Sequence, residues 1–198
     1  MKLKKFLSII SFLIITLMSM GSSNSIEPDI FVQSTVNRAS EALNDKFSKE
    51  EKIKKLKMIA SETVDIKGIG FYTLGSYRKE INEDQKKEYE KLFREYFLKS
   101  FASRLAEYSN PEIEVNSKEK LNENYTMVSS TLVATEQRPE VKINWRIYTK
   151  NTDKPLIRDL IIEGLSLART QKEEFASIIH SNDGDIKVLF TTLEKFIK

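Results

Sequence analysis

The chain has 198 residues, with 32 lysines and arginines against 29 aspartates and glutamates, a formal net charge of +3 and no cysteine. Three lysines at the extreme N-terminus account for this excess, so the rest of the chain has no net basic excess of the kind that indicates a nucleic-acid partner. Without cysteine, disulfides and thiolate metal sites are excluded, and stability must come from a buried core.

The first 25 residues have the pattern of an export signal. Lys2, Lys4 and Lys5 precede an apolar run at residues 6–18, and small or polar residues follow. The run is shorter than the roughly 20 residues that span a bilayer, which favours a cleavable signal peptide at residues 1–25, cut after Gly21 or Ser25. An uncleaved anchor helix is the alternative. The remaining residues, 26–198, suit a single domain.

Helical periodicity dominates the first half of that domain. We expect a helix over residues 28–47, a second helix that begins at Ser48, and one or two short helices with tight joints over residues 65–77, where three glycines occur. The longest helix is predicted for residues 82–108, with Asn82 as its N-cap and a wide aromatic stripe. Such a stripe must be covered on more than one side.

The second half changes to strand periodicity. Residues 112–115, 125–135, 141–149 and 156–163 alternate or are rich in β-branched residues, with turn residues between them. Short connections indicate antiparallel pairing. Two helices, over residues 166–180 and 185–196, close the chain. The predicted fold is α+β, a curved, antiparallel, four-stranded sheet packed against several helices.

Ser166 raises the question of catalysis, because DLIIEGLSLA at residues 159–168 has the outline of a nucleophile elbow. The only histidine, His180, would lie about 20 Å away along the same predicted helix. We therefore expect Gly164 to permit a sharp exit from the strand and Ser166 to cap the helix that follows. Asp159 and Glu163 fall on one strand face, and a salt bridge to Arg146 explains them better than a catalytic pair.

Cofactor and metal signals are absent from the sequence. One histidine and no cysteine remove zinc and most transition-metal sites, no acidic loop has the spacing of a calcium site, and the glycines at residues 68–75 lack the Lys-Ser/Thr of a phosphate loop. The remaining signal is a set of apolar residues on the predicted long helix and on the predicted strands. Periodicity does not distinguish a packed core from a lipid cavity in this set.

Two motifs in order resemble one known family. The stretch DLIIEGLSLA is similar to the Asp-x-x-x-Glu-Gly-x-Ser signature of the periplasmic phospholipid-binding components of the Mla pathway, the MlaC or toluene-tolerance family. The upstream stretch LGSYRKEINEDQKKEYEKLF resembles its second signature, although Tyr77 stands where the family usually has tryptophan. The matching positions are Leu74, Gly75, Arg78, Gln85, Asp159, Glu163, Gly164 and Ser166.

The resemblance implies a lipid carrier without catalytic residues or cofactor. It would hold the acyl chains of a glycerophospholipid in an apolar cavity between sheet and helices, and shuttle the lipid between an outer-membrane lipoprotein complex and an inner-membrane ABC transporter with an MCE-domain ring. In Gram-negative bacteria this maintains outer-membrane lipid asymmetry. The expected tail contacts are Phe93, Phe97, Val128, Ile143, Trp145, Ile147, Leu160 and Ile162.

Two alternatives belong to other functional classes. A periplasmic lipase or esterase would use Ser166 as its nucleophile, and a protein-binding adaptor would have a filled core and purify without lipid.

Overall fold

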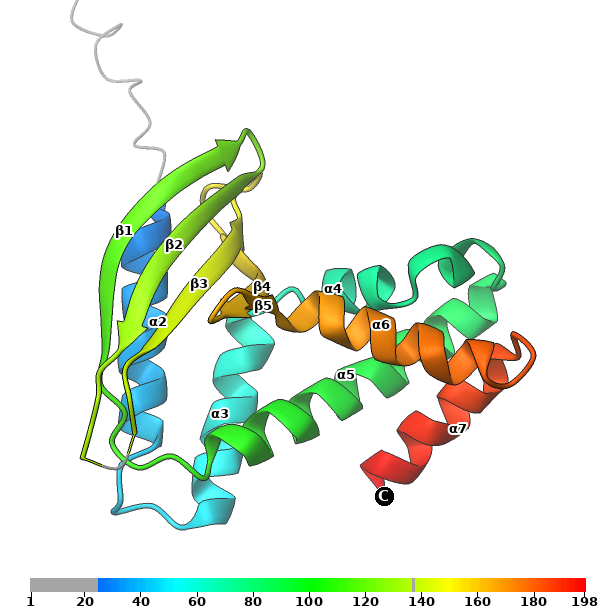
Figure 1. Ribbon diagram of the computed structural model, residues 1–198, viewed down its shortest axis with the longest axis horizontal. Coiled ribbons are helices and arrows are strands. Elements are labelled where there is room, and N and C mark those ends of the chain that lie inside the picture. The colour runs from blue at the N-terminus through cyan, green and yellow to red at the C-terminus, as the bar shows by residue number, and fades with distance from the viewer. Residues whose placement is uncertain (1–24, 137) are drawn as a thin grey trace, which may run out of the picture.

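The computed structural model describes residues 25–136 and 138–198 as a sheet joined to a set of helices (Figure 1). The predicted signal peptide, residues 1–25, falls almost entirely outside the described residues. Within them, no helix is both long and apolar enough to cross a membrane. The helices are α2 (Pro28–Ala42), α3 (Lys49–Thr63), α4 (Ile66–Thr73), the 3-10 helix η1 (Gly75–Lys79), α5 (Glu83–Leu105), α6 (Leu167–His180) and α7 (Ile186–Ile197).

The strands form one antiparallel sheet in chain order, which confirms the predicted fold class. They are β1 (Ile113–Asn122), β2 (Tyr125–Leu132), β3 (Val141–Tyr148), β4 (Leu156–Ile162) and β5 (Leu165–Ser166). The number of strands was wrong, because the two-residue β5 adds a fifth. Strand β1 is also longer than the predicted 112–115. Its second half is polar and exposed, so it is held by backbone pairing to β2, which side-chain periodicity does not report.

Two of the predicted helix starts are confirmed here by their caps. Ser48 is the N-cap of α3 and Asn82 the N-cap of α5, each in a capping box with the residue three positions later, Glu51 and Gln85. The predicted helix over residues 28–47 was too long, since α2 ends at Ala42. There the Asn44 side chain accepts a hydrogen bond from the Lys46 backbone N–H at 3.0 Å, a local bond that competes with continued helix.

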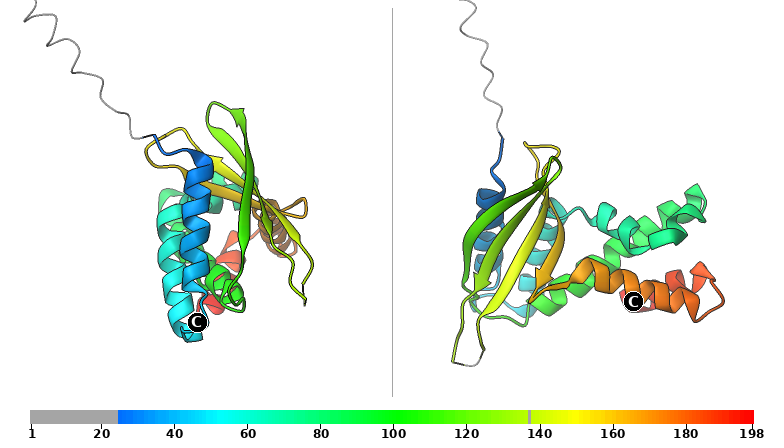
Figure 2. Two further views of the ribbon diagram at one scale, coloured as in Figure 1. Left: turned by 90° about the vertical axis from the view of Figure 1, so that its left-hand side faces the viewer. Right: turned by 45° about the horizontal axis from the view of Figure 1, so that its top comes forward.

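One face of the sheet forms the wall of the main core. Alternate residues of β2 and β3 are buried on it, and the Trp145 indole N–H donates to Ser130 Oγ at 2.8 Å, so the one polar atom of that side chain is satisfied. Figures 1 and 2 show α2 and α3 beside the sheet, whereas α4, α6 and α7 lie beyond the side of the sheet that β4 forms.

Helix α5 connects these two parts of the molecule. Its strongest helix contacts are with α3 toward one end and with α4 and α7 toward the other. Gly70 of α4 allows the close approach of the two helices, because a Cβ at this position would lie 2.7 Å from Cδ1 of Phe93. A smaller apolar cluster fixes the C-terminal end of α5; its buried members are Ala42, Leu43, Leu56, Ala102 and Ala106.

Candidate functional site

The eight predicted tail-contact residues lie in or beside one apolar cluster. Phe93 and Phe97 come from α5, and the others come from three adjacent strands. The register pairs Val128 with Trp145, Trp145 with Leu160 and Ile143 with Ile162, so these strand residues share one face of the sheet. Seven of them belong to the main core or pack against it, and Ile162 extends the same row.

Burial divides this set into two groups. The buried group, which forms ordinary close-packed core, is Phe93, Val128, Ile143, Trp145 and Ile147. Phe97, Leu160 and Ile162 are only half-buried. Leu165, the partner of Ile162 on β5, is 59% exposed and continues the row to the surface. We call these four residues, with the half-buried Phe101, the apolar margin.

The Glu163-Gly164 dipeptide forms the turn between β4 and β5. Both residues have positive φ, 49° and 83°, as in the tight turns of two-residue hairpin loops. The Glu163 carboxylate accepts the Lys142 backbone N–H at 2.5 Å, which fastens the turn to β3. Glu163 is therefore a turn residue, and Gly164 allows the sharp exit from the strand that the sequence predicted.

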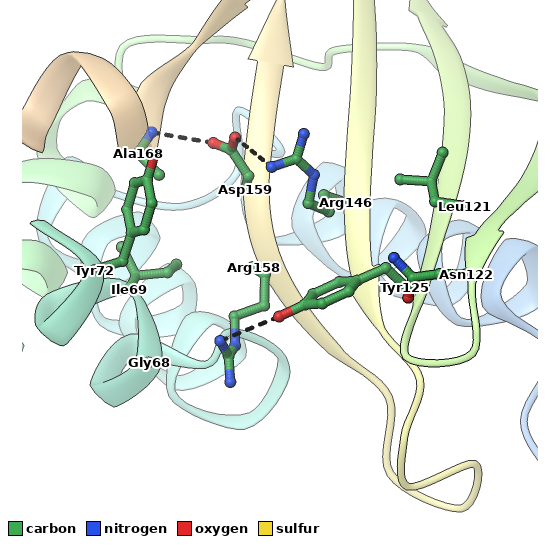
Figure 3. Close-up of a pocket in the computed structure, with 10 residues that line it drawn as sticks. All are labelled: Gly68, Ile69, Tyr72, Leu121, Asn122, Tyr125, Arg146, Arg158, Asp159 and Ala168. Atoms are coloured by element: carbon green, nitrogen blue, oxygen red, sulfur yellow. Dashed lines mark hydrogen bonds and ion pairs between the residues drawn. The ribbon is translucent and has the colours of Figure 1, made fainter.

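Asp159 and Ser166 together form the joint between the sheet and α6. Ser166 donates its hydroxyl to Asp159 Oδ2 at 2.6 Å and accepts the Arg169 backbone N–H at 3.1 Å, which confirms the predicted helix cap. The Ala168 backbone N–H donates to Asp159 Oδ1 at 3.0 Å (Figure 3). Asp159 is only 4% exposed, so these donors replace the water that its charge loses.

This geometry opposes nucleophilic catalysis at Ser166. His180 ends α6 and Ser166 precedes its first residue, so the whole helix of about 20 Å separates them. The Ser166 hydroxyl donates to the buried Asp159 carboxylate and accepts a helix N–H, and the one histidine of the sequence is out of its reach. The predicted pairing of Asp159 with Arg146 is confirmed as a long ion pair, 4.0 Å from Nη1 to Oδ2. The same prediction was wrong for Glu163, whose carboxylate accepts a backbone N–H at the β4–β5 turn.

The upstream motif residues position the start of α5. Gly75 has φ +58° at the joint between α4 and η1, Leu74 is buried, and Gln85 belongs to the capping box. Arg78 is exposed. Further along α5, the Tyr89 hydroxyl lies 2.9 Å from the Thr73 hydroxyl, and burial raises the pKa of Tyr89 above its usual value, so it stays a neutral hydrogen-bonding group.

The sequence interpretation missed a polar connection between α4 and the sheet edge. The Arg158 guanidinium donates from Nε to Asp65 Oδ2 at 2.5 Å, and Asp65 Oδ1 accepts the Gly68 N–H at 2.8 Å as the N-cap of α4. The Asp65 backbone N–H also donates to the carbonyl of Ile157. Residues 93 positions apart are joined here, and no local pattern marks that pairing.

Two comparisons place these features among known proteins. A protein-family model described as MlaC protein matches residues 33–195. Among solved structures, a phospholipid-binding protein from Ralstonia solanacearum, determined in complex with a phospholipid, superposes with a TM-score of 0.72 at 18% sequence identity, covering 87% of this chain and 97% of that one. The fold is therefore shared over nearly the whole of the described chain.

Proposed function

This chain belongs to the MlaC family, and on that premise we propose that it is a periplasmic carrier of glycerophospholipid between the outer and inner membranes. It would act as the soluble component of an Mla-type ABC transport system and maintain outer-membrane lipid asymmetry. The observation that carries the proposal is the family match together with a shared fold, whose solved example was determined in complex with a phospholipid.

The apolar margin is the proposed entrance for the acyl chains. Half-buried side chains such as Phe97 and Leu160 extend the buried core to the surface, so a tail that displaces them stays in continuous apolar contact. The main contacts of α5 are with α3, α4 and α7, and the strands meet it through side chains of the shared core. Movement of those side chains would open the cavity that the tails occupy. The eight predicted tail contacts would then line the widened cavity.

Transfer follows from the energetics of such a cavity. Each buried CH₂ group contributes about 0.8 kcal/mol, so a bound lipid leaves for water very slowly. Release therefore requires a partner that binds the empty or open form more tightly than the loaded one. We assign that role to the outer-membrane lipoprotein complex at one membrane and the MCE-domain ABC transporter at the other.

A carrier needs no catalytic residue, and the capping role of Ser166 favours it over a lipase or esterase. The half-exposed apolar row at β4 and β5 suits a lipid entrance and a protein-docking patch equally, so the family match is what favours the carrier over an adaptor. Placement in the periplasm rests on the predicted signal peptide.

The test is mass spectrometry of organic extracts from residues 26–198, purified without detergent from a bacterial periplasm. We expect near-stoichiometric phospholipid. Ile161 and Ile162 provide a matched pair of variants, because both are half-buried neighbours on β4 and point to opposite faces of the sheet. Ile162→Asn should lower the lipid content several-fold, and Ile161→Asn should not. Wild-type protein that carries no lipid and takes up none from liposomes would refute the carrier.

A further inference from the structure

A pocket lies on the opposite face of the sheet from the apolar margin. Its volume is about 410 Å³, and it lies between α4, the start of α6 and strands β1 to β4 (Figure 3). Arg146 lines it, and Arg146 stands between Trp145 and Ile147 on β3, so its side chain points away from the core that those two residues enter. We call this site the arginine pocket.

The charged groups of the arginine pocket favour an anion. Two arginines, Arg146 and Arg158, line it together with the Asp159 carboxylate. Asp65 forms an ion pair with Arg158 at the pocket wall, so Arg146 is the cation without a close carboxylate partner among the described residues. That carboxylate already accepts the Ser166 hydroxyl and the Ala168 N–H, and its 4.0 Å separation from Arg146 is too long for a hydrogen bond. The Arg146 side chain is 43% exposed, so its fork of N–H donors is available to a ligand.

Arg158 is held in place before any ligand arrives. Asp65 accepts its Nε–H, and its guanidinium carbon lies 4.7 Å from the centre of the Tyr148 ring. Gly68 leaves room for it, because a Cβ at that position would lie 2.6 Å from the guanidinium carbon. A cation fixed in this way loses little conformational entropy on binding.

Uncharged donors complete the lining. The Tyr125 hydroxyl oxygen accepts a long hydrogen bond, 3.5 Å, from Nη1 of Arg158. The phenol proton of Tyr125 is therefore available to a ligand. Asn122 uses its side-chain oxygen to accept the Asn124 N–H at 2.9 Å, so its amide NH₂ remains a donor. Tyr72 of α4 closes the side opposite Tyr125 (Figure 3).

We propose that the arginine pocket binds the phosphate group of a phosphate ester. A phosphate offers several acceptor oxygens to two guanidinium groups and the neighbouring hydroxyl and amide donors. At about 30 Å³ per water molecule, the volume corresponds to roughly 14 waters, which fits glycerol phosphate and is far too small for a complete phospholipid. The ligand is either a water-soluble phosphate ester or the headgroup of a lipid that reaches the pocket around the β4–β5 edge.

The first measurement is titration calorimetry with sn-glycerol 3-phosphate and with glycerol at low ionic strength. We expect saturable binding of the phosphate ester alone. Arg146→Gln should weaken it about 10- to 100-fold, the loss expected for charge-assisted hydrogen bonds, and Tyr125→Phe should weaken it less. The control is Arg94→Gln, which removes the same charge from an exposed position on α5. Circular dichroism checks that each variant is folded.

The outcomes separate this proposal from the carrier function. Absence of saturable binding, or equal weakening by Arg146→Gln and Arg94→Gln, overturns the arginine pocket even if the wild-type protein co-purifies with lipid. Selective weakening supports it. The phospholipid content of purified Arg146→Gln then identifies the source, because reduced lipid indicates the headgroup of the carried lipid, and unchanged lipid indicates a water-soluble ester.

Discussion

Replacing Ser166 by alanine tests whether the Asp159–Ser166 joint is structural. The change removes a 2.6 Å hydrogen bond to a buried carboxylate and the cap on the Arg169 N–H. Loss of a cap costs about 0.5–2 kcal/mol, and a hydrogen bond to a charged group contributes about 1.5–3 kcal/mol, with the two partly overlapping. We expect the free energy of unfolding to fall by about 1–3 kcal/mol, which lowers Tm by roughly 2–12 °C for a domain of this size.

The assay is thermal and urea unfolding followed by circular dichroism, beside hydrolysis of a short-chain p-nitrophenyl ester. Ser177→Ala is the control, since Ser177 is exposed on the same helix, and it should change stability by less than about 0.5 kcal/mol. Ser166→Thr keeps the hydroxyl and should restore most of the loss. Wild-type stability in Ser166→Ala would refute the structural role. Ester hydrolysis by the wild type that disappears in Ser166→Ala, while Ser177→Ala retains it, would establish a nucleophile.

Two further predictions concern packing and charge. Gly70→Ala forces a methyl group against Phe93 at 2.7 Å, so unfolding in urea should show a loss of about 1–3 kcal/mol; an unchanged midpoint would mean that the two helices separate freely. Hydrogen bonding to Lys118 holds the pKa of the Asp29 carboxyl below its ordinary value of 3.8. The resulting stabilisation is complete well above pH 4 and disappears as the pH falls through the lowered pKa. The urea midpoints of wild type and Lys118→Gln should therefore differ at about pH 6 and converge as the pH falls through the lowered pKa, and a difference independent of pH would contradict the assignment.

Local patterns predicted the parts of the fold whose stability is local. The start of α5 could be predicted because Asn82 and Gln85 lie within one turn of each other, and the antiparallel order followed from short connections between strands. The length of β1 could not be predicted, since its exposed second half is held by backbone bonds to β2. The early end of α2 depends on a hydrogen bond of the Asn44 side chain, and apolar periodicity contains no information about such polar bonds.

The candidate site was predictable only in part for a similar reason. Alternation placed Trp145 and Leu160 on one face of the sheet, and their cross-strand pairing confirms that they lie together. Alternation does not report depth, so the buried Val128 and the half-buried Ile162 could not be distinguished beforehand. Arg158 contacts Asp65 from a distant part of the chain, and both are common residue types without a motif around them. The arginine pocket therefore required the assembled structure.

The span of α5 has a mechanical consequence. Its 23 residues form a rod of roughly 35 Å. Ala102 fixes one end in the small cluster with α2 and α3, and Tyr89 fixes the other against Phe190 of α7. Because both ends are packed against other helices, α5 couples the two parts of the molecule, and a tilt of about 5° at the small cluster would displace the far end by roughly 3 Å over that length. Movement at the α2–α3 end of the molecule is therefore transmitted to α4 and α7, because both contact the same helix.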